Sequence, residues 1–378
     1  MKNVNGIKIL TYTGRVLLVI VTLLLAAVVA LYCVMLVLAK GPSPTARDLF
    51  VRSVMETSAA KFLARMYFTE EEIEAILDIE NSGSDRTDAG LIQIPGATNN
   101  KDKEKLPFED QDKKPPSGAD TSEPGADDTT DVTTPPDTTP PEPADNGVEV
   151  IDIKGGTYNG KLIIVKDPSR VRVGTLPTYG DSYTGKTLRK FISETGAIGG
   201  INAGGFYDEG GSGTGAEPDG IVIRGGEIIW GTAEEMYHCV IGFDKNNILH
   251  VGNMTGAQAL ADGIVDGLSF EGGPLLVVNG VPETTKHKLN GGLNPRTAIG
   301  QRADGAILLL VINGRQANSL GATHADTCNI MASYGAVNAA NLDGGSSSLM
   351  IYDGETLTQS AYFLGERKLP NVFLIMPE

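Results

Sequence analysis

The chain has 378 residues, of which 41% are hydrophobic, and its formal net charge at pH 7 is −16. This length is typical of more than one structural unit. A chain this acidic would repel the phosphates of nucleic acid, so we expect no nucleic-acid partner. With 4 histidines, a histidine-rich metal centre is also not expected.

The first predicted element is a membrane-spanning helix over residues 16–39, an apolar run between Arg15 and Lys40. About 24 residues in a helix cover roughly 36 Å, which spans a bilayer with some tilt. The end of the run lacks the small-residue motif of a signal-peptide cleavage site. We therefore interpret residues 1–43 as a cytoplasmic tail and an uncleaved anchor.

The charges around this span indicate its orientation. Lys2, Lys8 and Arg15 precede it, while Lys40 and Arg47 follow it. This bias favours a single-pass protein of the cell membrane with its N-terminus inside and the rest of the chain outside the cytoplasm.

Residues 44–94 predict a helical stalk next to the membrane. Apolar residues recur with helical spacing from Pro44 to Tyr67, and Thr69 and Glu72 have the spacing of a capping box. We expect two helices that end near Asn81. A simple spacer and a partner-binding pair of helices both fit this pattern.

Residues 95–147 have a different composition, rich in Pro, Thr and Asp and nearly free of large apolar side chains. Such a segment cannot bury enough apolar surface to offset the entropy lost on ordering. We therefore predict a disordered linker here, extended by its own charge.

Residues 148–378 alternate short apolar runs with turn residues and predict a folded domain of about 230 residues, long enough for a full core. Gly225-Gly226 and Asn279-Gly280 supply the positive φ angles of tight hairpins. Further strands are expected at 306–312 and 349–352, and helices at 183–195 and 323–334. The fold class is therefore α+β, with mixed β-sheets and a few packed helices.

The cysteines do not indicate a disulfide framework. Cys33 lies in the apolar run, and Cys239 and Cys328 are interpreted as small buried residues, although a disulfide between them stays open. His324 and Cys328 are four residues apart on a predicted helix, and core packing is favoured over a metal site.

Glycine-rich segments with embedded polar residues are the candidates for chemistry. They occupy residues 201–208, 294–300 and 341–348. Glycine lets the backbone approach a ligand closely and direct N–H groups at it. Each segment alone is also compatible with an ordinary turn.

Taken in order, these segments resemble the phosphodiester glycosidases, the family that includes the lysosomal uncovering enzyme and bacterial proteins associated with exopolysaccharide. The resemblance covers residues 199–377 and rests on Asn202-Ala203-Gly204-Gly205-Phe206, the run 218–223, Gly272-Gly273-Pro274-Leu275, the run 295–300, and Asn341-Leu342-Asp343-Gly344-Gly345. Ser346 stands where family members often carry a third glycine. This difference would narrow or re-aim the loop.

The resemblance implies cleavage of the bond between a sugar anomeric carbon and a phosphodiester. Because a phosphate group leaves as a stable anion, the site needs a cation and N–H donors more than a proton donor. We predict Arg296 as the phosphate clamp, since its planar guanidinium binds two oxygens at once. Backbone donors are expected from Gly204, Gly205, Gly344 and Gly345.

The sugar side of the reaction needs a carboxylate that activates water or attacks the anomeric carbon. Asp343 is the first candidate and Glu271 the second. Asp208 and Asp219 are further candidates, but they resemble loop residues more closely. Substrate-binding roles are predicted for Asn202, Asn313 and Ser346. If the sugar carries a 2-acetamido group, its own carbonyl could act as the nucleophile.

Other interpretations of these residues remain open. Arg296 and Asp343 could form a structural ion pair, and Asp343 could cap a turn. No cofactor is required, but a divalent cation bound by oxygen ligands, Asp343 among them, is compatible with the sequence.

We therefore expect a membrane-anchored extracytoplasmic hydrolase that acts on a phosphodiester-linked glycan or sugar nucleotide in the cell envelope. The alternative is a glycan-binding or exopolysaccharide-assembly protein with the same fold and no turnover. The sequence leaves open the sugar, the stereochemical outcome and the oligomeric state.

Overall fold

The computed structural model describes residues 2–57, 60–77, 86–94, 146–208, 213–286, 289, 291–362 and 364–378, with side chains described from residue 15 onward. The predicted linker at 95–147 therefore lies almost wholly outside the described residues. Met1–Pro95 and Gly147–Glu378 form one compact unit.

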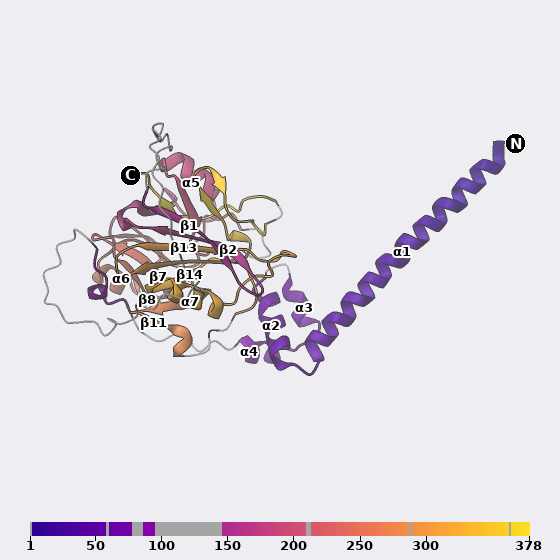
Figure 1. The fold of residues 1–378 in the computed structure, drawn as a ribbon, viewed down its shortest axis with the longest axis horizontal. Helices are drawn as coiled ribbons and strands as arrows, with labels where there is room; N and C mark the ends of the chain where they lie inside the picture. The colour runs from indigo at the N-terminus through magenta and orange to yellow at the C-terminus, as the bar shows by residue number, and fades with distance from the viewer. Residues whose placement is uncertain are drawn as a thin grey trace, which may run out of the picture. The chain divides into compact units, whose positions relative to one another are not determined.

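The C-terminal domain is built from sheets that lie in layers (Figure 1). A seven-stranded sheet has the order β1 (Val148–Lys154), β2 (Asn159–Val165), β13 (Ile307–Ile312), β12 (Arg296–Arg302), β14 (Ala336–Leu342), β10 (Leu275–Val278) and β11 (Val281–Pro282). A five-stranded sheet has the order β16 (Glu355–Thr356), β15 (Met350–Tyr352), β4 (Gly199–Asn202), β17 (Asn371–Ile375) and β3 (Val171–Thr175). The other five-stranded sheet has the order β6 (Glu227–Trp230), β5 (Val222–Arg224), β9 (Ile264–Ser269), β7 (Met236–Asp244) and β8 (Leu249–Thr255).

Short helices accompany these sheets. They are α5 (Leu188–Thr195), α6 (Gly256–Ala261) and α7 (His324–Ser333), with 3₁₀ turns η3 (Pro168–Arg170), η5 (Glu283–Thr285) and η6 (Gly345–Ser347). Helix α7 packs on β10, β12 and β14 of the seven-stranded sheet. The α+β class predicted from the sequence is confirmed.

The predicted hairpins form at the expected turn residues. Strands β5 and β6 pair around Gly225-Gly226, and β10 and β11 pair around Asn279-Gly280. Asn279 and Gly280 have φ angles of 54° and 77°, in the left-handed region that a tight turn with this twist requires. Local chemistry therefore determines these turns.

One predicted helix is shorter than expected, since α5 begins at Leu188 rather than near residue 183. Thr187 caps it by accepting a hydrogen bond from the N–H of Lys190. Lys186, just before the cap, exchanges backbone hydrogen bonds with Leu369. This β-bridge keeps Lys186 out of the helix. The helix expected at 323–334 is confirmed by α7, with Thr323 as its cap.

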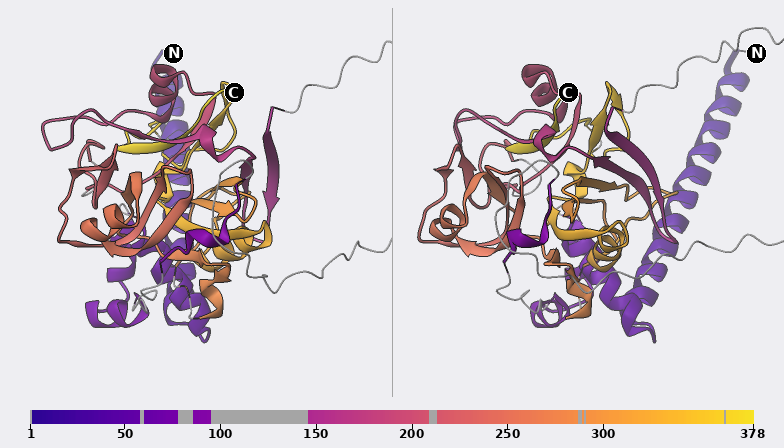
Figure 2. Two further views of the ribbon diagram at one scale, coloured as in Figure 1. Left: turned by 90° about the vertical axis from the view of Figure 1, so that its left-hand side faces the viewer. Right: turned by 60° about the vertical axis from the view of Figure 1, so that its left-hand side comes forward.

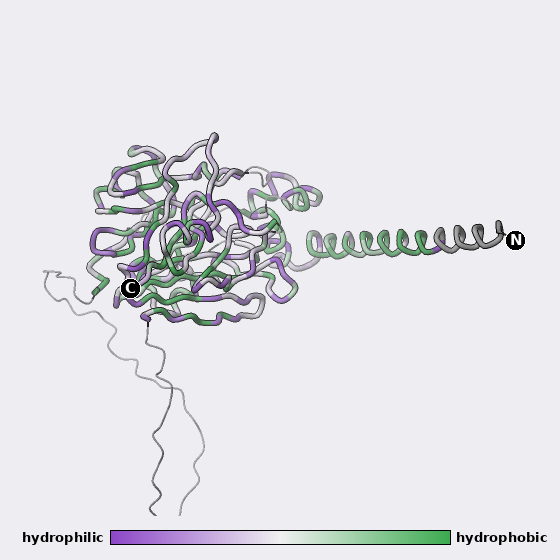
Figure 3. The backbone as a smooth tube through the Cα atoms, turned by 90° about the horizontal axis from the view of Figure 1, so that it is seen from above, coloured by the Kyte–Doolittle hydropathy of each residue, from purple (hydrophilic) through white to green (hydrophobic). Residues whose placement is uncertain are grey.

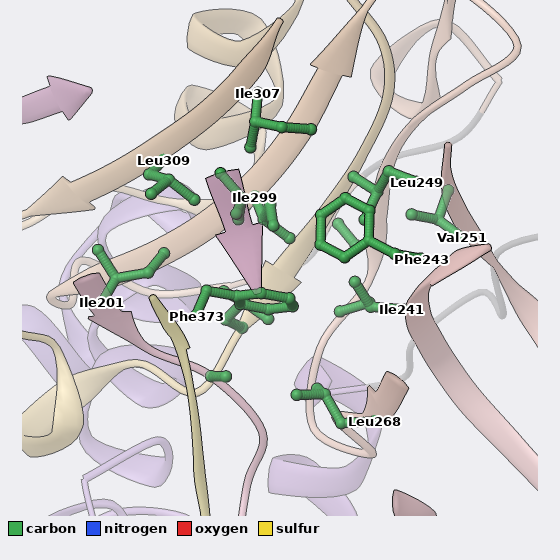
Figure 4. Close-up of a cluster of buried hydrophobic side chains, with 14 of the residues drawn as sticks. Ile201, Ile241, Phe243, Leu249, Val251, Leu268, Ile299, Ile307, Leu309 and Phe373 are labelled. Atoms are coloured by element: carbon green, nitrogen blue, oxygen red, sulfur yellow. The ribbon is translucent and has the colours of Figure 1, made fainter. Parts of the chain in front are cut away.

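Figure 2 shows the strands of the domain from two further sides. The hydrophobic core lies between the three sheets that they form. Its largest cluster draws buried side chains from all of them, and the rings of Phe243 and Phe373 meet edge to face with centroids 6.1 Å apart. Figure 4 shows these rings among Ile201, Ile241, Leu268 and Ile299. Because all three sheets contribute, their loops are held in fixed relation to one another. Cys239 and Cys328 are buried and free, as expected from the sequence.

The N-terminal helix α1 (Lys2–Lys40) contains the predicted apolar span. Its part Arg15–Lys40, 26 residues, is long and apolar enough to cross a membrane. Figure 3 shows this apolar stretch as continuous along the helix. A signal sequence near the N-terminus can meet the same criterion of length and composition.

The described stalk residues form three α-helices, where we predicted two, and the predicted end near Asn81 lies outside the described residues. They are α2 (Pro44–Met55), α3 (Lys61–Arg65) and α4 (Glu70–Leu77), and they pack with the end of α1 through a small apolar cluster around Val51 and Ile73. The first predicted helix is interrupted because α2 ends at its C-cap, Glu56, whose side chain binds the domain. The capping box of Thr69 and Glu72 is confirmed at the start of α4.

The stalk contacts the domain at two places. Near α2, the N–H of Leu293 donates to the Ser53 hydroxyl at 2.9 Å. Further along, Arg86 forms a β-bridge with Gly252, and the Asn279 side-chain carbonyl accepts the N–H of Asp88 at 2.7 Å, before the short 3₁₀ turn η2 (Ala89–Leu91). The stalk is thus packed onto the domain along much of its length.

Candidate functional site

The three glycine-rich segments singled out in the sequence meet around one cavity of about 820 Å³. The first contributes Phe206 and Asp208, the second Asn294 and Arg296, and the third Asn341 and the run from Asp343 to Ser347. Strand pairing explains the convergence, because Thr297 at the start of β12 lies opposite Leu342 at the end of β14.

Asn202, at the end of β4, joins the first segment to the other two. It is fully buried, and its Nδ2 donates to the backbone carbonyl of Asp343 at 2.6 Å. Its Oδ1 accepts hydrogen bonds from the Thr297 hydroxyl and the N–H of Leu349. Asn202 was predicted to bind substrate, but in the structure its amide is occupied in holding the loop that carries Asp343.

Asp343 is the predicted carboxylate that lines the cavity. Burial raises its pKa to about 6, with a contribution from the charge of Asp208, although Ser347, Arg367 and the Gly344 N–H oppose the rise. A carboxyl group that titrates near pH 6 can exchange protons at the pH of most cellular compartments.

Asp219 opens onto the same cavity. Enclosure by the surrounding protein, together with the charges of Asp343 and Glu271, raises its pKa to about 7. Its backbone N–H donates to the carbonyl of Gly205, and a side chain at Gly205 would overlap its carboxylate. The structure therefore places Asp219 and Asp343, two carboxyl groups with raised pKa values, in one hollow.

Arg296 also lines the cavity, but its guanidinium is already bound to protein groups. It is buried, and it forms an ion pair with Glu56 of the stalk, with 2.7 Å between Nη2 and Oε2. Its Nε donates to the carbonyl of Ala322, and Nη1 lies 2.7 Å from Nε2 of His324. Arg296 thus pairs with Glu56, where the sequence had suggested a structural pair with Asp343.

Arg315 and Arg367 add two further guanidinium groups to the cavity. Arg367 lies over the rings of Phe206 and Tyr362, each 5.1 Å away, and forms an ion pair with Asp208 at 2.8 Å. Its Nη1 donates to the hydroxyl of Ser346 at 3.3 Å. The Ser346 side chain, predicted to bind substrate, therefore contacts this arginine.

Other predicted site residues lie outside the residues that line the cavity. Glu271 accepts the N–H of His238 and the hydroxyl of Ser269. The amide of Asn313 binds Asn159, and the N–H of Gly204 donates to Asn371. These contacts fix neighbouring segments. Glu271, Asn313, Gly204 and Gly205 are therefore not among the residues that line the cavity, although Glu271 is close enough to raise the pKa of Asp219.

Residues 195–376 match the family model of the phosphodiester glycosidases. The chain therefore carries a phosphodiester glycosidase domain, and the resemblance inferred from the ordered motifs is confirmed.

Individual relatives of the phosphodiester glycosidase domain are distant. The uncharacterized SPbeta prophage-derived protein YomE of Bacillus subtilis is 39% identical over 90 residues, which are 23% of this chain and 14% of YomE. The catalytic domain of zebrafish N-acetylglucosamine-1-phosphodiester alpha-N-acetylglucosaminidase, in a form auto-inhibited by its pro-peptide, has a TM-score of 0.49 at 19% identity, over 61% of this chain and 82% of the other. A putative exported protein of Burkholderia pseudomallei has a TM-score of 0.43 at 16% identity, over 58% and 74%.

Sequence reasoning missed several residues of the phosphodiester glycosidase domain that line the cavity, among them Asp219, Arg315 and Arg367. Asp219 lies inside the motif Pro218-Asp219-Gly220, so its position in the family pattern was a usable signal. Arg315 and Arg367 lie outside the quoted motifs, and only the fold brings them to the cavity.

Within the described ranges, no group of three or more His, Cys, Asp and Glu side chains is arranged to hold a metal ion. Cation binding by Asp343 together with backbone carbonyls stays a prediction. The aromatic rings of Phe206, Phe270 and Tyr362 give the cavity apolar walls, which suit the faces of a sugar ring.

Proposed function

We propose that this chain is a membrane-anchored, extracytoplasmic hydrolase that cleaves the bond between a sugar anomeric carbon and a phosphodiester in a glycan or cell-envelope polymer. The observation that carries this proposal is the cavity itself, which is lined both by the carboxyl groups of Asp343 and Asp219 and by the guanidinium groups of Arg315 and Arg367. The family match and the apolar helix α1 are consistent with it.

The proposed division of labour follows from charge. The ionised carboxylate of Asp343 activates water or attacks the anomeric carbon, where positive charge develops in the transition state. The arginines that line the cavity, Arg296, Arg315 and Arg367, balance the negative charge that the leaving phosphate acquires. Gly344 and Gly345 shape the loop beside Asp343, and Gly345 has a φ of 58°, which favours glycine.

Asp219 takes the complementary role. With a pKa of about 7 it keeps a proton at pH values where Asp343 has lost its own. In that state its carboxyl group donates a hydrogen bond to a departing phosphate oxygen or to a sugar hydroxyl. Unequal pKa values in a pair of carboxyl groups are the usual basis for assigning an acid and a base.

The proposal is tested by sugar release from a UDP-sugar by the purified full chain in detergent micelles. We expect Asp343→Asn to lower kcat by about 10³-fold, the range for loss of a general base. Asp152→Asn is the matched control, because that side chain is 70% exposed on strand β1 and pairs with Lys161. Unchanged turnover in Asp343→Asn would contradict the assigned role.

The same experiment separates the hydrolase from a glycan-binding protein without turnover. Binding of the UDP-sugar with no release of sugar by the wild-type chain would favour the binding protein. Release by the wild-type chain and by Asp152→Asn, but not by Asp343→Asn, would favour the hydrolase.

A further inference from the structure

The carboxylate of Glu56, carried on the stalk, is bound by donors of three different kinds. Oε1 accepts the backbone N–H of Gly292 at 2.7 Å. Oε2 accepts the side-chain amide of Asn294 at 2.9 Å and pairs with Nη2 of Arg296 at 2.7 Å. A backbone amide, a side-chain amide and a guanidinium therefore converge on one anion.

These donors are held in place by the domain. Arg315 donates from Nε and Nη2 to Oδ1 of Asn294, which orients the Asn294 amide nitrogen toward Glu56. The guanidinium of Arg296 is fixed by the carbonyls of Ala322 and Gly292. The geometry that receives the carboxylate is thus set by residues of the domain, independently of the stalk.

The charged groups around the Glu56 carboxylate favour an anion at this position. Arg296 is buried, and a buried cation is costly unless an anion pairs with it. Burial alone would raise the pKa of Glu56, but Arg296, His324 and the Gly292 N–H outweigh it and hold that pKa below its ordinary value. The domain therefore binds the ionised form of the carboxylate.

The same donors lie in the cavity that contains the proposed catalytic carboxylate. Glu56, Asn294 and Arg296 line it together with Asp343. A phosphate group carries negative charge and several acceptor oxygens, and arginine with N–H donors is a usual combination for binding it. Glu56 thus occupies a place that suits the phosphate of a glycosyl phosphodiester.

We propose that Gly292, Asn294 and Arg296 form a phosphate subsite of the cavity and that Glu56 of the stalk is a built-in competitor for it. Phosphate binds when the stalk withdraws, so its apparent affinity is reduced by the fraction of molecules in which the stalk is in place. The identity of the substrate rests on the proposed function, whereas the competition between Glu56 and phosphate does not.

The test measures the binding of inorganic phosphate to the full chain in detergent micelles by titration calorimetry. Glu56→Gln keeps the size of the side chain and removes its charge. Glu71→Gln is the matched control, because Glu71 is an exposed glutamate of the same stalk. We expect at least tenfold tighter phosphate binding in Glu56→Gln and wild-type binding in Glu71→Gln. Equal or weaker binding in Glu56→Gln would overturn the proposal.

A second variant covers the outcome in which Glu56→Gln does not fold. Ser53→Ala removes the hydroxyl that accepts the N–H of Leu293 and leaves every donor of the subsite intact. Because Ser53→Ala loosens the stalk, this variant should bind phosphate a few-fold more tightly. Adding phosphate should also raise its melting temperature by more than it raises that of the wild type. No change in either quantity would contradict a competing stalk.

Phosphate binding does not require turnover, so the two proposals fail separately. If Glu56→Gln binds phosphate more tightly but no sugar is released, the proposal of a phosphate subsite stands and the proposal of a hydrolase fails. If sugar is released but the affinity for phosphate is the same in Glu56→Gln as in wild type, the proposal of a hydrolase stands and the proposal of a phosphate subsite fails.

Discussion

At the scale of single residues, the chemistry depends on two carboxyl groups whose pKa values are raised by enclosure and by neighbouring carboxylates. The charge of Asp343 acts on Asp219, and the charge of Asp208 acts on Asp343. Asp343 is raised to about 6 and Asp219 to about 7. Because the groups interact, they titrate as a pair, and the pH dependence of the reaction reports the pair.

The first prediction concerns this pH dependence. The value of kcat/KM should rise as the pair loses its first proton near pH 6 and fall as it loses the second near pH 7, giving a narrow bell. Asp219→Asn cannot lose a proton and should remove the fall on the alkaline side. If kcat/KM of Asp219→Asn still falls above pH 7, a group other than Asp219 causes the loss of activity at alkaline pH.

The pH dependence of the melting temperature tests the raised pKa of Asp219 independently. A carboxyl group whose folded pKa is above its unfolded value stabilises the fold in its neutral form, and that contribution is lost as the pH rises through the folded pKa. Asp219→Asn should therefore raise the melting temperature relative to wild type at pH 8 and change it little at pH 4. A difference that does not depend on pH would contradict the raised pKa.

At the scale of elements, the site exists because strand ends are tied together. Asn202 at the end of β4 binds the backbone of Asp343, the hydroxyl of Thr297 in β12, and the N–H of Leu349 before β15. Its amide therefore connects loops that are far apart in sequence.

Replacing Asn202 with alanine should leave buried polar groups without partners. We expect a loss of about 3 kcal/mol in the free energy of unfolding, measured with urea. The KM should change little, because the amide does not line the cavity. Normal stability with a tenfold rise in KM would instead support the sugar-binding role first predicted for this residue.

A substitution at Gly292 tests whether displacing the stalk from the domain tightens phosphate binding. A methyl group at this position would overlap the backbone of Ser53 in α2. Gly292→Ala should push the stalk away while keeping the Gly292 N–H and Arg296, and phosphate binding should tighten about as much as in Glu56→Gln. Unchanged binding would mean that the stalk adapts without leaving the subsite.

Features that depend on neighbouring residues were predictable from the sequence. The Asn279-Gly280 turn, the cap of α7 at Thr323 and the capping box at Thr69 all follow from side chains within a few positions of one another. The convergence of the glycine-rich segments was predictable only as an ordered set of motifs.

Contacts between distant residues were not predictable in this way. Glu56 and Arg296 meet because the stalk packs beside the start of β12, and helical periodicity carries no information about that packing. The periodicity also continued through Glu56, whereas α2 ends there as its side chain binds the domain. The roles predicted for Asn202 and Gly204 assumed free polar groups, but both are bound within the fold.

At the scale of the whole molecule, the apolar helix, the stalk and the phosphodiester glycosidase domain form a connected arrangement. The end of α1 packs against the stalk helices, and the stalk contacts the cavity through Glu56 and the opposite part of the domain through Arg86. In this account the segment next to the membrane influences access to the cavity.

The central claim is cleavage between the anomeric carbon and the phosphodiester oxygen, and the fate of water oxygen tests it most directly. The full chain would be incubated with a UDP-sugar in water enriched in ¹⁸O, and the products weighed by mass spectrometry. The account predicts one ¹⁸O atom in the released sugar and none in the nucleotide product. Label in the phosphate of the nucleotide would show cleavage of a phosphorus–oxygen bond and contradict the account.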